Sequence, residues 1–222
     1  MKKYMLALGL SLLTVLGLFT GCSPKAETAS DSDSLKIVAT IFPEYDWVRQ
    51  VLGDRAGEVE LTLLLDSGTD LHSYQPTAAD MLTIGECDLF LYNGGESDAW
   101  VERVLATAAN PDRRTLSVME VLGDSVLEEE VVEGMQEAED HDHAEGEAHE
   151  EEADEHVWLS LRNARTACAE IARVLGELDP DHAAEYQTNA ENYMAELEAL
   201  DGEYAALAEN AARRTVLVGD RF

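Results

Sequence analysis

The feature of this sequence that most constrains its fold is a regular alternation of short apolar runs with helix-like segments. The apolar runs, rich in residues that favour strands, stand at residues 35–41, 59–65, 88–92 and 115–119. Segments with helical patterns separate them, at residues 43–52, 76–85 and 98–109. Because strands that alternate with helices are typical of βαβ units, the sequence predicts an α/β fold with a mainly parallel sheet.

The second half of the chain is predicted to be helical. One helix is expected at 160–178, and Asp179 and Pro180 mark the start of another that runs to about residue 212. Apolar residues recur along this long helix at alternating spacings of four and three, which favours core packing over a coiled-coil seam. These residues are Tyr186, Ala190, Tyr193, Leu197, Leu200, Tyr204 and Leu207. A strand is expected at 215–218, and we interpret residues 213–222 as the start of a second lobe that is largely absent from this chain.

The N-terminus has the features of an export signal. Lys2 and Lys3 precede an uncharged apolar run, and Cys22 follows small residues. We interpret residues 1–21 as a lipoprotein signal peptide, Cys22 as the lipidated residue, and residues 22–34 as a flexible tether. The alternative is a secreted protein with a chance cysteine at this position. The lipoprotein interpretation predicts an extracytoplasmic protein that is anchored to the cell membrane by lipid.

Charge and cysteine content exclude several classes of partner and site. The formal net charge is −31, which argues against nucleic acid as a partner because phosphate binding requires basic patches. Cys87 and Cys168 stand in apolar stretches, so a disulfide and two buried free thiols both remain open. No CxxC motif is present, which argues against a thiolate zinc site.

Histidines supply the candidate metal ligands. Residues 128–155 form an acidic, His-rich segment without Lys or Arg, which we interpret as a loop inserted in the domain. His141, His143 and His149 lie in it beside carboxylates, a combination that suits divalent cations such as zinc. The alternative is a solvated acidic loop with incidental histidines. His72 and His156 stand on loops ahead of helices, where they are either converging metal ligands or ordinary surface or capping residues.

The sequence does not favour an enzyme. It contains neither HExxH nor GxSxG, nor a Gly-rich loop of the kind that holds phosphates. No general base stands beside the histidines in the sequence, which disfavours a zinc hydrolase.

From Leu35 to Phe222 the chain resembles the zinc/manganese ABC-transporter solute-binding lipoproteins, the cluster A-I metal-binding proteins. The resemblance rests on five motifs in a fixed order: KIVATIFPEYDWVRQVLGD, GTDLHSYQPTAADM, DLFLYNGGESDAW, HVWLSLRNA and DPDHAAEYQTNAENYMAELEALD. It implies two α/β lobes joined by a long rigid helix, with a metal ion held between the lobes by three histidines and a carboxylate. Residues 35–178 would then be the N-terminal lobe and residues 179–212 the interlobe helix.

The resemblance also assigns residues to the site. His72 matches the first histidine of the family and His156 the second. Gly219 stands where the third histidine is expected, and the adjacent Asp220 is a candidate substitute. The fourth ligand would lie beyond residue 222.

Together these features predict a protein that binds Zn²⁺ outside the membrane and delivers it to the membrane permease of a metal ABC importer. Mn²⁺ stays open as the ion, because two histidines and a carboxylate do not exclude it. The alternative is a lipoprotein that buffers or sequesters metal at the cell surface through its His-rich acidic loop.

Overall fold

The computed structural model describes residues 34–66, 68–107, 109–128 and 153–213. The predicted signal peptide, Cys22, most of the tether and most of the acidic segment lie outside the described residues, as does the strand expected at 215–218. Within the described part, no helix is both long and apolar enough to cross a membrane.

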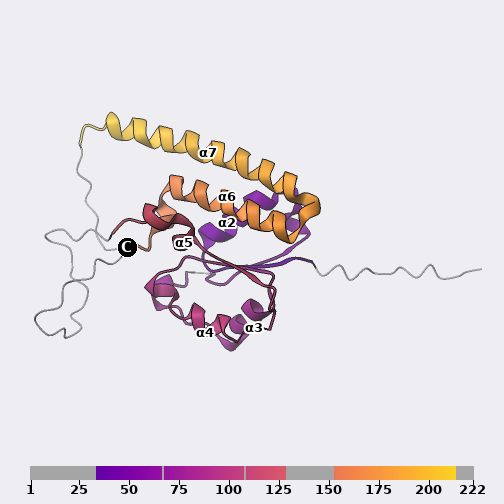
Figure 1. Ribbon diagram of the computed structural model, residues 1–222. Helices are drawn as coiled ribbons and strands as arrows, with labels where there is room; N and C mark the ends of the chain where they lie inside the picture. The colour runs from indigo at the N-terminus through magenta and orange to yellow at the C-terminus, as the bar shows by residue number, and fades with distance from the viewer. Residues whose placement is uncertain (1–33, 67, 108, 129–152, 214–222) are drawn as a thin grey trace, which may run out of the picture. The chain divides into compact units, whose positions relative to one another are not determined.

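A parallel four-stranded sheet forms the centre of the fold, which confirms the predicted α/β class (Figure 1). Its strands are β1 (Lys36–Ala39), β2 (Glu60–Leu63), β3 (Leu89–Tyr92) and β4 (Arg114–Ser117). They lie in the order β2-β1-β3-β4, and every neighbouring pair is parallel. All four strands therefore end at the same edge of the sheet, where the connecting loops gather.

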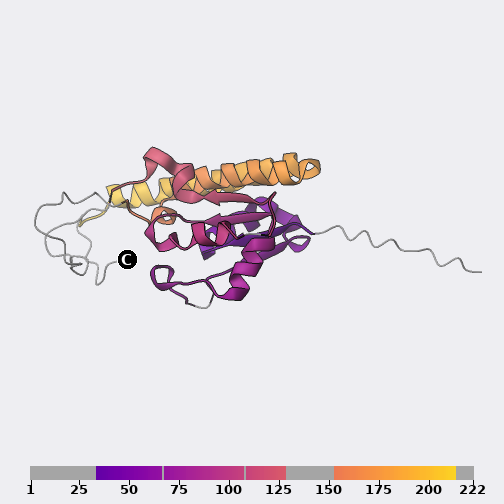
Figure 2. The same cartoon turned by 60° about the horizontal axis from the view of Figure 1, so that its bottom comes forward.

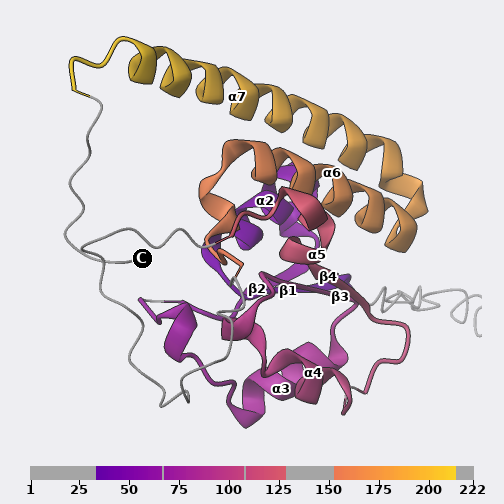
Figure 3. The ribbon, with the colours of Figure 1, turned by 60° about the vertical axis from the view of Figure 1, so that its left-hand side comes forward.

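Helices cover both faces of the sheet, as Figure 3 shows. The helices α2 (Phe42–Leu52), α5 (Val118–Leu122) and α6 (Leu161–Leu178) lie on one face. The other face carries α3 (Ala78–Glu86) and α4 (Val101–Leu105). Alternate strand residues feed two separate apolar clusters, since Ile37 and Leu89 pack in the first and Val38 and Phe90 in the second.

Each of the two cysteines described lies in a different cluster. Cys168 is buried in the cluster that contains Ile37, and Cys87 is buried in the cluster that contains Val38. Both are free thiols. Of the two alternatives left open by the sequence, the structure shows buried free thiols, because the sheet separates the two sulfur atoms.

Two predicted elements differ in the structure. The helix expected at 98–109 is shorter, because Asp98 belongs to a 3₁₀ turn (Glu96–Asp98) and its buried carboxylate accepts a hydrogen bond from the Gly94 N–H. The strand expected at 115–119 ends at Ser117. There the serine hydroxyl accepts the N–H of Glu120 and so begins the short helix α5, which local apolar character alone does not distinguish from a strand.

The long second helix of the C-terminal half begins differently from the prediction. A 3₁₀ turn (Pro180–His182) precedes α7 (Ala183–Glu209). The Asp179 carboxylate accepts hydrogen bonds from the ring of His182 and from the hydroxyl of Tyr186, and caps no backbone N–H of the turn.

The helix α7 lies along α6 (Figure 1), and Figure 2 shows this long helix, orange to yellow, from another side. Its apolar stripe is covered over only half of its length. Tyr186, Ala190 and Leu197 are buried. Further along, Tyr204 is 61% exposed and Leu207 is 69% exposed. The prediction that the stripe packs on the core is therefore correct for its first half and wrong for its second half among the described residues.

Candidate metal centre

His72 lies in the loop that follows β2, at the carboxyl edge of the sheet. The carboxylate of Asp70 accepts the His72 backbone N–H at 3.1 Å and so begins a short 3₁₀ turn (Leu71–Ser73). Leu71 is buried and anchors this turn to the domain. The side chain of His72 remains 51% exposed, which leaves its ring accessible to a ligand from solvent.

His156 lies at the start of another 3₁₀ turn (Val157–Leu159). One carboxylate oxygen of Asp154 is 2.9 Å from both the backbone nitrogen and the ring Nδ1 of His156. Val157 is buried, and the ring of Trp158 lies with its centroid 5.3 Å from that of His156. The side chain of His156 is only 19% exposed, so its orientation is well constrained.

The structure brings these two histidines together. Their ring centroids lie 5.5 Å apart and the ring planes are tilted by 59°. The pair is formed by loops from distant parts of the sequence that end at the same edge of a parallel sheet, where α/β domains commonly bind ligands. The sequence left open whether the two histidines converge or are ordinary surface or capping residues, and the structure places their rings near each other.

Ser97 and Glu155 link the two loops. The carboxylate of Glu155 accepts the Ser97 backbone N–H at 3.0 Å and also the Ser97 hydroxyl. Since that hydroxyl donates to Glu155, its oxygen accepts the hydrogen bond from Nδ1 of His72, at 2.9 Å. The network therefore assigns the His72 proton to Nδ1.

The same tautomer follows for His156. Asp154 offers an acceptor to Nδ1 of His156, so Nδ1 carries the proton there as well. A neutral ring with its proton on Nδ1 keeps the lone pair of Nε2, which is the form of imidazole that coordinates a metal ion. Pairing of the second ring nitrogen with an oxygen acceptor is the usual arrangement around metal-binding histidines.

The turn after β3 holds Glu155, the residue before His156, in place. Asn93 is buried at the end of β3 and its amide donates to the backbone carbonyl of Glu155 at 2.9 Å. Gly95 has φ of 81°, and a Cβ at this position would collide with the Glu155 carboxylate. Glycine is therefore required here both by its backbone conformation and by the close approach of Glu155.

Sequence reasoning did not find Asn93, Ser97 or Glu155 as site residues. The run Asn93-Gly94-Gly95 at the end of a strand was the available signal, because such residues mark a turn at the ligand-binding edge. Glu155 was assigned to the acidic loop on composition. The structure shows that the last residues of that segment, Ala153 to Glu155, belong to the ordered lobe and that Ala153 forms an antiparallel bridge with Glu128.

The other predicted site residues are not placed. Asp220, His141, His143 and His149 lie outside the described residues. Within the part of the chain that the structure describes, no group of three or more His, Cys, Asp or Glu side chains is arranged to hold a metal ion. His72 and His156 therefore stay candidate ligands, and the other donors of a complete site would have to come from elsewhere.

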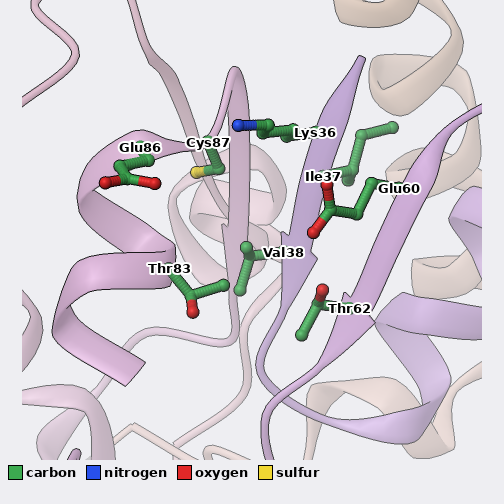
Figure 4. A pocket seen from close by; sticks show the side chains of 8 residues that line it. All are labelled: Lys36, Ile37, Val38, Glu60, Thr62, Thr83, Glu86 and Cys87. Atoms are coloured by element: carbon green, nitrogen blue, oxygen red, sulfur yellow. The ribbon is translucent and has the colours of Figure 1, made fainter. Parts of the chain in front are cut away.

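A small pocket of about 70 Å³ lies at the opposite edge of the sheet (Figure 4). Lys36 and Glu60, the first residues of their strands, line it together with Cys87. Burial raises the pKa of the Cys87 thiol to about 12, so the thiol stays protonated and is a poor metal ligand. This pocket is separate from the histidine pair and has no comparable set of donors.

A parallel sheet covered by helices on both faces, with donor side chains gathered at its carboxyl edge, defines an α/β ligand-binding lobe. The family described as "ZnuA: Zinc-uptake complex component A periplasmic" matches residues 37–221. The chain belongs to this family, whose members are solute-binding proteins.

Three relatives illustrate the similarity. The zinc-binding lipoprotein AdcA of Streptococcus pneumoniae is 33% identical over 216 residues, which make up 97% of this chain and 40% of AdcA. The crystal structure of Zn(II)-bound AdcA from that organism superposes with a TM-score of 0.62 and 28% identity, covering 81% of this chain and 34% of the other. The solute-binding protein FpvC from Pseudomonas aeruginosa, in complex with Mn²⁺, superposes with a TM-score of 0.59 and 30% identity, covering 81% and 57%. The chain thus spans well under two thirds of the length of these relatives.

Proposed function

We propose that this chain is the N-terminal lobe and interlobe helix of an extracytoplasmic solute-binding protein that captures Zn²⁺ and delivers it to a metal ABC importer. The observation that carries the proposal is the pair of histidine rings at the carboxyl edge of the sheet, 5.5 Å apart and each with an oxygen 2.9 Å from Nδ1. Membership of the zinc-uptake family supports the same function.

The donor set favours zinc. Neutral imidazole nitrogen is a preferred ligand of Zn²⁺, which usually takes four ligands in a tetrahedral arrangement. His72 and His156 would supply two of them. Asp220 is our candidate for a third, and His141, His143 and His149 would capture metal in the acidic segment. Mn²⁺ remains an alternative ion, since FpvC, a structural relative, is known in complex with Mn²⁺.

The histidine pair is tested by zinc titration against a competing chelator. Replacing His72 by Ala is expected to weaken tight binding by more than about 100-fold, because loss of a direct ligand should exceed the 10- to 100-fold effect of losing an outer partner. The matched control is His182→Ala. It removes a histidine that lies just before α7 and whose ring is hydrogen-bonded to the carboxylate of Asp179. Equal zinc affinity in the two variants would exclude His72 as a ligand.

A second titration compares pH 7.5 with pH 5.5. Protonated imidazole cannot coordinate a metal ion, so zinc affinity should fall at the lower pH. Unchanged affinity between the two pH values would contradict ligation by histidine.

Deleting residues 129–152 distinguishes a transport binding protein from the alternative, a metal buffer that acts through the acidic segment. The deletion keeps Asp154 and Glu155, which hold His156 and Ser97 in place. Because Glu128 and Ala153 are bridged, a short turn can replace the deleted residues without moving their neighbours. A transport protein is expected to keep its tight zinc equivalent after this deletion. Loss of all measurable binding would favour the buffer.

Localisation and partners follow from the proposal. Lipidation at Cys22 would anchor the protein outside the membrane, where it would meet the permease of the importer. Metabolic labelling with a fatty acid tests the anchor, since Cys22→Ser should abolish incorporation of label and release the protein from the membrane fraction.

A further inference from the structure

Buried polar side chains lie beside the turns that follow the neighbouring strands β1 and β3, and are called here the polar cluster. Glu44 is 0% exposed, Asn93 is 1% exposed and Asp98 is 4% exposed. None of them was a candidate site residue in the sequence. Burying an ionised carboxyl group costs free energy of desolvation, so each such group requires a hydrogen-bond partner, a counter-ion or a proton.

Each carboxyl group in this cluster uses one oxygen and leaves the other unpaired. One oxygen of Glu44 (Oε2) accepts the N–H groups of Thr40 and Ile41, at 3.0 and 3.2 Å. Asp98 accepts the Gly94 N–H through Oδ2, at 2.9 Å. Among the described residues, three buried oxygens have no hydrogen-bond partner. They are Glu44 Oε1, Asp98 Oδ1 and Asn93 Oδ1.

The charges that face this cluster are negative. Asp98 acts on Glu44 from the turn after β3, and Glu155 acts on Asp98 from the segment before His156. None of the ion pairs among the described residues includes Glu44 or Asp98. Two buried carboxylates without a counter-ion repel each other in a medium of low dielectric constant, which favours retention of a proton.

We propose that Glu44 and Asp98 form a proton-binding site that holds one proton between them at neutral pH. The proton sits on Oε1 of Glu44, the carboxyl oxygen that accepts no hydrogen bond among the described residues. When it leaves, it passes to solvent and the pair carries two negative charges.

This site is connected to the candidate metal centre through the turn after β3. Asp98 follows Ser97 in the chain and accepts the Gly94 N–H, while Asn93 donates to the carbonyls of Gly94 and Glu155. Asp98 therefore supports the turn that positions Ser97 and, through it, His72, while Glu44 holds the turn after the neighbouring strand β1. The proposal does not depend on metal binding and can be tested without metal.

The ionisation of both groups fits this assignment. Burial raises the pKa of Glu44 to about 8, and the charge of Asp98 adds to the effect. Burial also raises the pKa of Asp98 to about 6, with a further contribution from Glu155. Because the two carboxyl groups interact, they titrate together, and the higher of the two apparent pKa values belongs to the pair.

The test is a carbon-13 NMR titration of the metal-free protein, labelled at the glutamate side-chain carboxyl carbon. One glutamate resonance is expected to titrate near pH 8, far above the others, and to be missing from the Glu44→Gln variant. The variant Glu60→Gln, which removes an exposed glutamate on β2, should keep it. In Asp98→Asn the midpoint should move down, because the like charge is removed and an amide donor takes its place.

Two results would overturn the proposal. If every glutamate resonance of the unmodified protein titrates in the ordinary carboxylate range, the pair holds no proton at neutral pH. If the high midpoint is present but Asp98→Asn leaves it unmoved, the proton belongs to Glu44 alone. Should Glu44→Gln fail to fold, the unmodified protein and Asp98→Asn decide the question by themselves.

Discussion

The hydroxyl oxygen of Ser97 lies 2.9 Å from Nδ1 of His72, and the same hydroxyl donates to the carboxylate of Glu155. Through this one side chain, the loop after β2 is joined to the segment that carries His156. The orientation of the half-exposed His72 ring depends on it.

Ser97→Ala removes the acceptor of the His72 ring proton. We expect zinc affinity to fall by about 10- to 100-fold, the usual cost of losing an outer partner of a metal ligand. Titration with a competing chelator measures the change. Ser125→Ala, at an exposed serine after α5, is the matched control and should leave the affinity unchanged. Equal effects of the two substitutions would show that Ser97 does not position His72.

Gly95→Ala places a side chain where the backbone has φ of 81° and where the Glu155 carboxylate approaches. We expect a loss of about 1–3 kcal/mol in the free energy of unfolding from backbone strain and displacement of Glu155. Urea unfolding measures it. Gly202→Ala in α7 is the control of opposite sign, since a Cβ there meets nothing within 4 Å and alanine favours the helix by about 0.5–1 kcal/mol. A neutral Gly95→Ala would contradict the close approach of Glu155.

The pH dependence of stability should report the buried proton. The folded protein holds a proton on Glu44 up to about pH 8, whereas the unfolded chain releases it near the ordinary value of 4.5. Between these values the folded state binds more protons, so stability falls as pH rises, with a limiting slope of about 1.4 kcal/mol per pH unit for one proton. Urea unfolding across this range should show the slope in the unmodified protein and a flatter profile in Glu44→Gln. Identical profiles would mean that Glu44 ionises normally.

The two halves of the α7 stripe should respond differently to truncation. Leu197 is buried against the first apolar cluster, and Leu197→Ala is expected to cost about 2–5 kcal/mol of unfolding free energy. Leu207 is 69% exposed, and Leu207→Ala should change the free energy by less than about 0.5 kcal/mol. Comparable losses from the two substitutions would show that the second half of the stripe is covered in this protein.

Much of the fold was predictable because its elements have local causes. The strands lie within short runs of mainly apolar residues, and Thr77 and Asp80 form the capping box that their spacing indicates. The two histidines were recognisable as residues on loops ahead of helices, and His72 also as a residue at the carboxyl end of a strand. Their partners were not, because the contacts between Ser97 and Glu155 and between Asn93 and Glu155 join distant parts of the chain.

The remaining errors have a similar origin. Periodicity shows that α7 has an apolar face but does not show how far a neighbour extends along it. Burial of Glu44 was invisible because its place in the first turn of a helix is also typical of an exposed acidic residue. Whether an acidic residue in a first helical turn is buried depends on tertiary packing, which the local sequence does not show.

The bridge between Glu128 and Ala153 has a consequence for the segment between them. It joins the two ends of that segment immediately before Asp154 and Glu155, the groups that hold His156 and Ser97. The length and the histidine content of residues 129–152 can therefore be redesigned as an independent module, with the lobe left unchanged.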